Sequence, residues 1–251
     1  MKPSEKSREI SAAVEAAART LADSADQLRF GGRTAFVYNP LDYAWESHAA
    51  YIRRYGAGSK RVLFLGMNPG PWGMAQTGVP FGEVSLVRDW LQIEANITGP
   101  QVQHPKRRIH GFDCSRSEVS GRRLWGLMRE RFGTPDRFFQ DHYVANYCPL
   151  IFLEEGGKNL TPDKLPATER ENLFRICDSH LQEMVRCFHP DYVIGIGKFA
   201  AARSETALRE STDRPVVGSI LHPSPASPLA NRGWAEQVYR KLGEMGIWKE
   251  K

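Results

Sequence analysis

Four short apolar runs alternate with segments of helical periodicity, and this alternation constrains the fold more than any other feature of the chain. The runs cover residues 61–66, 142–146, 191–197 and 216–221. Unbroken apolar runs of this length are typical of strands that are covered on both faces. Because strands that alternate with helices form βαβ units, we expect an α/β fold. It would be a single domain over residues 1–251, with a central, mostly parallel four-stranded sheet and helices on both faces.

Helical periodicity covers much of the chain between these runs. Residues 1–28 are interpreted as an N-terminal helical segment, because apolar residues recur there at helical spacing, with an amphipathic helix over residues 5–28. The same criterion predicts further helices over residues 41–55, 84–95, 117–132, 173–188, 199–210 and 231–245. Gly-Pro and His-Pro pairs interrupt residues 96–116, so this stretch is expected to be irregular, as are residues 150–166.

The composition fits an ordinary globular protein whose length allows one full core. The formal net charge of +5 is compatible with a polyanionic partner but does not by itself indicate one. Basic residues cluster at 106–108, 122–123 and 129–131, and each cluster is interpreted as a solvated face rather than a phosphate clamp. No apolar run approaches the roughly 18 residues of a membrane span, and residues 1–9 lack the apolar core of a signal peptide. We therefore expect an intracellular protein without a membrane partner.

The chain contains four cysteines, and no two of them have C-x-x-C spacing. They are Cys114, Cys148, Cys177 and Cys187. A four-cysteine iron–sulfur cluster is the alternative that this number raises, but the scattered spacing disfavours it. We expect reduced, mostly buried thiols, no metal and no cofactor.

Three polar, proline-rich segments begin where predicted strands end. They start after Gly66, at Asn146 and at His222. In open parallel sheets the ligand binds beyond the carboxyl ends of the strands, so we expect these segments to converge in one cleft.

The first of these segments, residues 66–82, is rich in glycine and proline, which fix a rigid path and allow close backbone approach. Such a loop could present Asn68 to a small planar ligand. Alternatively, it could be a purely structural connection between elements, or a loop that binds a phosphate group. It lacks both G-x-G-x-x-G and G-K-[ST], which disfavours phosphate binding. Asn146 could read the edge of a pyrimidine or form a turn. His222, held between a strand and a proline, could be catalytic or structural.

Together the segments resemble the motifs of the uracil-DNA glycosylase superfamily, and within it the single-strand-selective monofunctional uracil-DNA glycosylase family. The motifs are Gly66-Met-Asn-Pro-Gly70 with its extension to Gly82, Asn146-Tyr-Cys-Pro149, His222-Pro-Ser-Pro225, Ser117-Glu-Val-Ser-Gly121 and Leu124-Trp-Gly126. The resemblance runs from about residue 30 to residue 248. An Asn in the first motif combined with a His in the last separates this family from relatives with an Asp in the first motif and from mismatch-specific enzymes without the His.

The resemblance implies two catalytic residues, Asn68 and His222. Asn68 would position the attacking water. An amide is not a strong general base, so the reaction would depend on stabilising the leaving uracil. A neutral His222 would donate a hydrogen bond to the uracil oxygen on which negative charge builds.

The resemblance also implies how the base and the DNA are bound. Asn146 would read the uracil edge, and Phe81 would stack on the ring. Gly70 and Met74 would lie near the pyrimidine 5-position, where the family accepts oxidised substituents. The DNA-binding residues implied are Ser224, Pro225, Ala226, Ser227 and Arg232.

One departure from the family concerns the loop after the last motif. Members of the family have a basic residue there that wedges into the duplex, whereas this chain has Ala226 and Ser227. Arg232 lies further along and is a candidate substitute. We therefore expect weaker extrusion from duplex DNA and a preference for single strands, because unstacking costs less there.

The activity implied is that of a monofunctional glycosylase of base excision repair. It would flip uracil out of single- or double-stranded DNA and hydrolyse the N-glycosidic bond, leaving an abasic site. No lysine in the three motifs offers a Schiff-base nucleophile. A monomer without metal or cofactor is expected, in the cytoplasm with the nucleoid of a bacterium or in the nucleus of a eukaryote.

Two alternatives remain open. One is a glycosylase for deaminated purines such as hypoxanthine and xanthine. The other is a catalytically silent DNA- or nucleotide-binding module, although the presence of both Asn68 and His222 argues against silence. Outside the motifs, Lys198 and Arg203 are interpreted as a solvated helix face and two tryptophans as core residues: Trp234 and Trp248.

Overall fold

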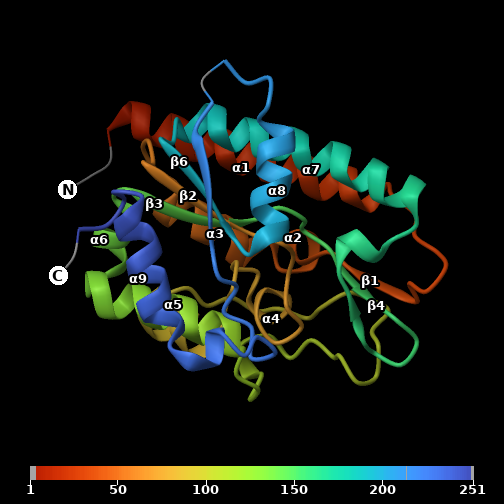
Figure 1. Ribbon diagram of the computed structural model, residues 1–251. Coiled ribbons are helices and arrows are strands. Elements are labelled where there is room, and N and C mark those ends of the chain that lie inside the picture. Colours follow the sequence, from red (N-terminus) through yellow and green to blue (C-terminus); the bar gives the residue numbers. More distant parts are fainter. Residues whose placement is uncertain (1–3, 213, 250–251) are drawn as a thin grey trace.

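A four-stranded parallel sheet lies at the centre of the computed structural model, which describes residues 4–212 and 214–249 (Figure 1). The strand order is β3-β2-β6-β7, and each neighbouring pair is parallel. The strands are β2 (Val62–Gly66), β3 (His142–Asn146), β6 (Tyr192–Ile196) and β7 (Val216–Ile220). The α/β fold is confirmed, and each strand lies within the apolar run that predicted it. Of the predicted span 1–251, residues 1–3, 213 and 250–251 lie outside the described residues.

Helices cover both faces of this sheet, as expected. The chain passes from β2 to the neighbouring β3 through α5 (Val119–Phe132) and α6 (Pro135–Phe139). It then crosses back to β6 through α7 (Ala167–Phe188) and reaches β7 through α8 (Lys198–Ala207). Because such crossovers are right-handed and the chain reverses direction at β3, the first two helices lie on one face and the other two on the opposite face.

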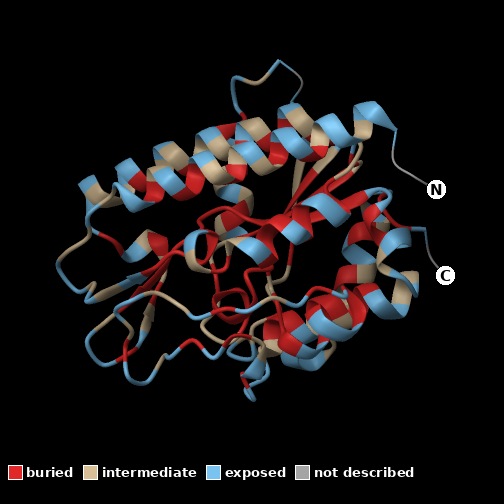
Figure 2. Ribbon diagram, turned by 180° about the vertical axis from the view of Figure 1, so that it is seen from behind, coloured by how far each residue is buried: buried red, intermediate tan, exposed pale blue. Residues whose placement is uncertain are grey.

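The first and last helices complete the two layers. α1 (Glu5–Asp26) packs along α7, and α9 (Trp234–Glu244) packs beside α5 (Figure 1). Ser4 caps α1 by accepting a hydrogen bond from the Ser7 N–H at 3.2 Å. The helix ends two residues before the predicted boundary at residue 28, and residues 1–3 of the predicted segment are not among the described residues. Figure 2 shows the inner part of the sheet buried, including all of β2 and β3, and the outer helix faces exposed, which is the amphipathic pattern that predicts such helices.

The predicted helix over residues 41–55 is divided in two. α2 (Pro40–Tyr43) and α3 (Trp45–Tyr55) meet at Ala44, whose backbone is not helical. The break allows the start of α3 to hold the long loop after β2. Two of its side chains hydrogen-bond backbone carbonyl groups of that loop: Ser47 and His48.

The helix predicted over residues 84–95 begins where predicted but is shorter, because the helical segment covers residues 84–90 only. One π-helical turn is present, over Leu86–Trp90. The chain then turns at Gln92, whose φ is +53° and whose carbonyl oxygen accepts a hydrogen bond from Arg54 at 3.1 Å. Arg54 lies on α3, so a contact distant in the sequence determines where this segment ends.

Residues 150–166 are not irregular, and that prediction is wrong. They contain β4 (Ile151–Leu153) and β5 (Asn159–Leu160), which join β1 (Phe36–Tyr38) in an antiparallel sheet of order β1-β4-β5. Strands of two or three residues are too short to show the alternation that identifies a strand in a sequence.

The other predicted helices are present with shifted ends. α5 begins two residues later than predicted, and α7 begins at Ala167, ahead of the predicted residues 173–188. α8 ends at Ala207, before the predicted residue 210. A 3-10 turn, Ala230–Arg232, replaces the first turn predicted for α9.

Candidate active site

The loops after β2 and β3 run side by side beyond the sheet. Gly66 and Asn146 are paired at the ends of their strands, and two backbone hydrogen bonds of 2.9 Å continue the ladder past them. Asn68 Nδ2 then donates to the Leu150 carbonyl oxygen at 3.2 Å. This bond ties the first-motif amide to the β3 loop, so Asn68 and Asn146 lie at the same end of the sheet, as predicted.

The side chain of Asn146 is buried, with 8% of its surface exposed. Its Nδ2 lies 3.3 Å from the sulfur of Met74, in the short helix α4 (Met74–Thr77). Among the described residues, no group donates a hydrogen bond to Asn146 Oδ1. A buried acceptor without a partner costs about 1–3 kcal/mol, which favours a ligand that supplies an N–H.

Phe81 lies between Asn146 and His222. A Cβ placed on Gly66 would lie 2.5 Å from Cε2 of the Phe81 ring and would also touch Asn146 Oδ1. The Phe81 and His222 ring centroids are 6.1 Å apart, with the rings tilted by 42°. These contacts bring the three loops together in one place, which is the convergence expected from the sequence.

The backbone of Phe81 adopts a φ of +53°, which is unfavourable for a side chain of this size. Two residues of α5 hold it there. Trp125 Nε1 donates to the Pro80 carbonyl oxygen at 3.1 Å, and a Cβ on Gly121 would collide with the Phe81 carbonyl oxygen. The Ser-Glu-Val-Ser-Gly and Leu-Trp-Gly motifs therefore have a physical role, which is to position Phe81.

His222 follows β7 and is half-buried. Burial lowers the pKa of its imidazole below the usual value of 6.5. The ring is therefore neutral at pH 7 and keeps one N–H to donate. Trp234 Nε1 fixes the strand end by donating to the Leu221 carbonyl oxygen at 2.7 Å.

Arg123 of α5 holds the loop that contains His222. Its guanidinium donates to the Pro223 carbonyl oxygen at 3.1 Å and to Asn231 Oδ1 at 2.8 Å. The interpretation of cluster 122–123 as a solvated face is therefore wrong for Arg123. The two ends of this contact lie about a hundred positions apart in the sequence, so no local pattern identifies it.

Gly70 packs against the carboxylate of Glu118, which the sequence did not single out. A Cβ on Gly70 would lie 2.6 Å from Glu118 Oε2. Burial raises the pKa of the Glu118 carboxyl, while hydrogen bonds from the backbone N–H groups of Ser120 and Trp72 lower it to a smaller extent. In this structure the missing side chain of Gly70 makes room for Glu118. Its implied position near the pyrimidine 5-position stays a prediction, as does that of Met74.

The implied DNA-binding residues lie on a compact surface turn. The Ala226 N–H donates to Ser224 Oγ at 3.2 Å, and the Ser227 N–H donates to the Ser224 carbonyl oxygen at 3.1 Å. Pro225, Ala226 and Arg232 are exposed. The turn is therefore accessible from the solvent, and its contact with DNA stays a prediction.

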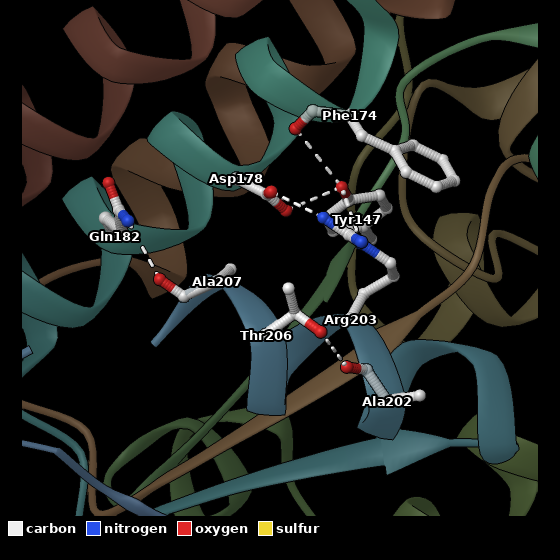
Figure 3. Close-up of polar contacts among 8 residues, drawn as sticks. All are labelled: Tyr147, Phe174, Asp178, Gln182, Ala202, Arg203, Thr206 and Ala207. Atoms are coloured by element: carbon white, nitrogen blue, oxygen red, sulfur yellow. Dashed lines mark hydrogen bonds and ion pairs between the residues drawn. The ribbon is translucent and has the colours of Figure 1, made fainter. Parts of the chain in front are cut away.

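Arg203 is not on a solvated face, so that prediction is wrong. Its guanidinium lies 2.5 Å from Asp178 Oδ2, and its Nε donates to the Tyr147 hydroxyl at 3.2 Å. The same hydroxyl donates to Asp178 Oδ1 at 2.7 Å, and Figure 3 shows these side chains pointing toward one another. Since Tyr147 follows Asn146, this network between α7 and α8 anchors the β3 loop. Lys198 is exposed, as expected.

The remaining predicted residues are placed as follows. Trp234 and Trp248 are buried, as expected, and Cys114, Cys148 and Cys177 are buried free thiols. Cys187 is a half-buried free thiol. Within residues 4–212 and 214–249, no three His, Cys, Asp or Glu side chains form a group that could hold a metal ion. No helix in the same ranges is long and apolar enough to cross a membrane.

Comparison with known proteins agrees with this geometry. The family model of the uracil DNA glycosylase superfamily matches residues 53–242. The single-strand selective monofunctional uracil-DNA glycosylase of Rattus norvegicus is 48% identical over 248 residues, covering 94% of this chain and 89% of the relative. The corresponding Mus musculus protein is 49% identical over 221 residues, covering 88% and 79%. The crystal structure of Pedobacter heparinus SMUG2 covers 92% of this chain and 99% of its own, with a TM-score of 0.63. Its 15% identity makes it a likeness of fold alone.

The fold and the site define a uracil-DNA glycosylase superfamily protein. Within that superfamily, the chain belongs to the single-strand selective monofunctional uracil-DNA glycosylase family.

Proposed function

We propose that this protein is a monofunctional uracil-DNA glycosylase of base excision repair. It flips uracil out of DNA, hydrolyses the N-glycosidic bond and leaves an abasic site. The observation that carries the proposal is the buried, unpartnered acceptor Asn146 Oδ1, which faces the same glycine as the Phe81 ring. The names and identity of the relatives support the same activity.

The site supplies two of the groups that bind a uracil. Asn146 Oδ1 accepts the ring N–H, and Phe81 offers an aromatic face for stacking. Thymine differs from uracil only at the 5-position, so discrimination between them depends on the loop around Gly70 and Met74. We propose that this loop also admits oxidised 5-substituents.

Bond cleavage depends on the leaving group. The bond between the sugar C1′ and the base N1 breaks, and its electron pair passes into the uracil ring. The neutral imidazole of His222 donates its N–H to the oxygen on which this charge accumulates, a contribution typically worth about 3–4 kcal/mol. A water held by Asn68 forms the new bond to C1′ and gives up its proton to the solvent, and the departing uracil anion takes up a proton from the solvent. Because an amide is a poor base, this water adds after the bond to the base has largely broken.

The finer details of the reaction are also proposals. We propose that the protein prefers single-stranded DNA, because Ala226 cannot wedge into a duplex as a long basic side chain does. It acts as a monomer without a metal or cofactor, in the compartment that holds the DNA: the cytoplasm of a bacterium or the nucleus of a eukaryote.

The test is to incubate the protein with matched single- and double-stranded oligonucleotides that contain one uracil, in the presence of a metal chelator. We expect free uracil and abasic sites, with faster release from the single strand. Oligonucleotides with thymine, hypoxanthine or xanthine at the same position provide the comparison. Release of a purine without release of uracil, or binding without release of any base, would overturn the proposal.

A further inference from the structure

Trp72 lies in the turn between Gly70 and Met74, and the reaction described above gives it no role. Its indole ring is half-buried and lies beneath two guanidinium groups. The guanidinium carbon of Arg116 is 4.5 Å from the ring centroid, and that of Arg107 is 5.3 Å away. Both distances are within the range of cation–π attraction.

A buried amide fixes the two segments that form this cluster. Gln76 is fully buried, and its Nε2 donates to the Pro71 carbonyl oxygen at 2.9 Å and to the Arg108 carbonyl oxygen at 3.2 Å. Its Oε1 accepts from the His110 N–H at 2.8 Å. Gln76 therefore joins the residue before Trp72 to the residue after Arg107.

Two further contacts hold the cluster in place. The Tyr38 hydroxyl donates to the Arg107 carbonyl oxygen at 3.1 Å. The Glu118 carboxylate accepts a hydrogen bond from the Trp72 backbone N–H. The aromatic ring and the Arg107 backbone are thus positioned by the fold itself, before any ligand binds.

The charge of this surface is uncompensated. Residues 106–116 contain four cationic side chains and one acidic side chain, Asp113. In the described part of the chain, none of the four cations forms an ion pair with a carboxylate: Lys106, Arg107, Arg108 and Arg116. The guanidinium of Arg116 is exposed, so its N–H groups are available to a phosphate. Arg107 Nη1 donates to the Lys106 carbonyl oxygen at 3.0 Å and its Nε is buried, so its remaining Nη N–H groups are the ones that can face a phosphate.

We propose that Trp72, Arg107 and Arg116 form a phosphate-binding site for the DNA strand that flanks the extruded nucleotide. The inference rests on the proposed function, because it takes DNA as the partner. Two residues of chain span at most about 7 Å, so Trp72 is close to both Gly70 and Met74 at the pocket. The site therefore contacts the strand beside the extruded nucleotide. It needs no complementary strand, so it supplies affinity for single-stranded DNA where the loop at Ala226 lacks a basic wedge.

Binding to a single-stranded oligonucleotide with a tetrahydrofuran abasic-site analogue tests the proposal, because the analogue cannot be cleaved. Fluorescence anisotropy over a series of salt concentrations gives both the affinity and its salt dependence. We expect the double variant Arg107→Ala/Arg116→Ala to bind about tenfold more weakly, and the slope of log Kd against log salt to fall by about 1.4, since each single-strand phosphate contact contributes about 0.7. Arg116→Ala alone changes an exposed side chain, and it should lower the slope by about 0.7.

Arg8→Ala is the matched control, because it removes the same charge from an exposed position at the start of α1. It should leave both quantities unchanged. Trp72→Ala should weaken binding, and Trp72→Phe should restore most of it by keeping an aromatic face under the guanidinium groups. The single-turnover rate of uracil release at saturating protein should stay within about threefold in every variant. Arginine variants with the affinity and the salt slope of wild type would overturn the proposed phosphate-binding site. If the proposed activity were wrong, the wild-type protein would release no uracil in the cleavage assay, whatever the binding assay showed.

Discussion

Replacing Gly66 with alanine adds a single methyl group at the point where Phe81 and Asn146 meet. That carbon would lie 2.5 Å from Cε2 of Phe81 and would also press on Asn146 Oδ1. Carbon atoms in contact normally lie about 3.5–4 Å apart, so the ring must move by about 1 Å. A misplacement of this size can lower a rate about 100-fold, and such overpacking typically costs about 1–3 kcal/mol of stability. We expect Gly66→Ala to fold and to release uracil about 100 times more slowly.

The assay is single-turnover release of uracil from a single-stranded oligonucleotide, together with thermal unfolding of each variant. Gly126→Ala is the control, because a Cβ there would meet nothing within 4 Å and the residue lies in α5. Alanine at this position should add up to about 1 kcal/mol of stability without changing the rate. A Gly66→Ala rate within about threefold of wild type would refute the argument that Phe81 and Asn146 meet at this glycine.

Three further predictions follow from buried groups. Burial lowers the pKa of His48 and His142 from 6.5 to about 4. The free energy of unfolding that the two neutral rings contribute is therefore fully present above pH 6.5, and it is lost as the pH falls toward 4. Urea unfolding should show on the order of 3 kcal/mol lost per histidine, and a stability that stays constant from pH 7 to pH 4 would contradict this. Arg203→Ala should cost about 2 kcal/mol in the same assay, because it removes the guanidinium from Asp178 Oδ2 and leaves that carboxylate only the Tyr147 hydroxyl. A loss below about 0.5 kcal/mol would mean that the network does not anchor the loop. His222→Leu should lower kcat about 10²–10³-fold, and a loss under about threefold would show that its N–H does not serve the leaving base.

The central sheet and the convergence of the motifs could be predicted because both depend on long, regular signals. Each strand of that sheet is an apolar run of about five residues between helices, and parallel connection places all their carboxyl ends on one edge. Asn146 is the last residue of its strand, and Asn68 and His222 come two residues after the ends of theirs. Their grouping therefore follows from the order of the strands and does not depend on side-chain packing.

The features that could not be predicted depend on contacts between distant residues. The second sheet consists of strands too short to show a period, and the break at Ala44 serves the docking of α3 on another loop. Arg123 clamps a loop about a hundred positions away, and Glu118 fills the space that Gly70 leaves. The contact at Gly121 could have been predicted from the sequence, because a glycine within a helix is unfavourable unless another part of the chain approaches it closely.

The central claim is that Asn146 Oδ1 takes the ring N–H of an extruded uracil. Its most direct test compares single-turnover release of uracil and of 3-methyluracil from the same position in the same single-stranded oligonucleotide. The methyl group replaces the hydrogen that Asn146 would accept, and sites built to bond such a group reject analogues lacking it by large factors, so we expect release at least about 100-fold slower. Equal rates for the two bases would contradict the account.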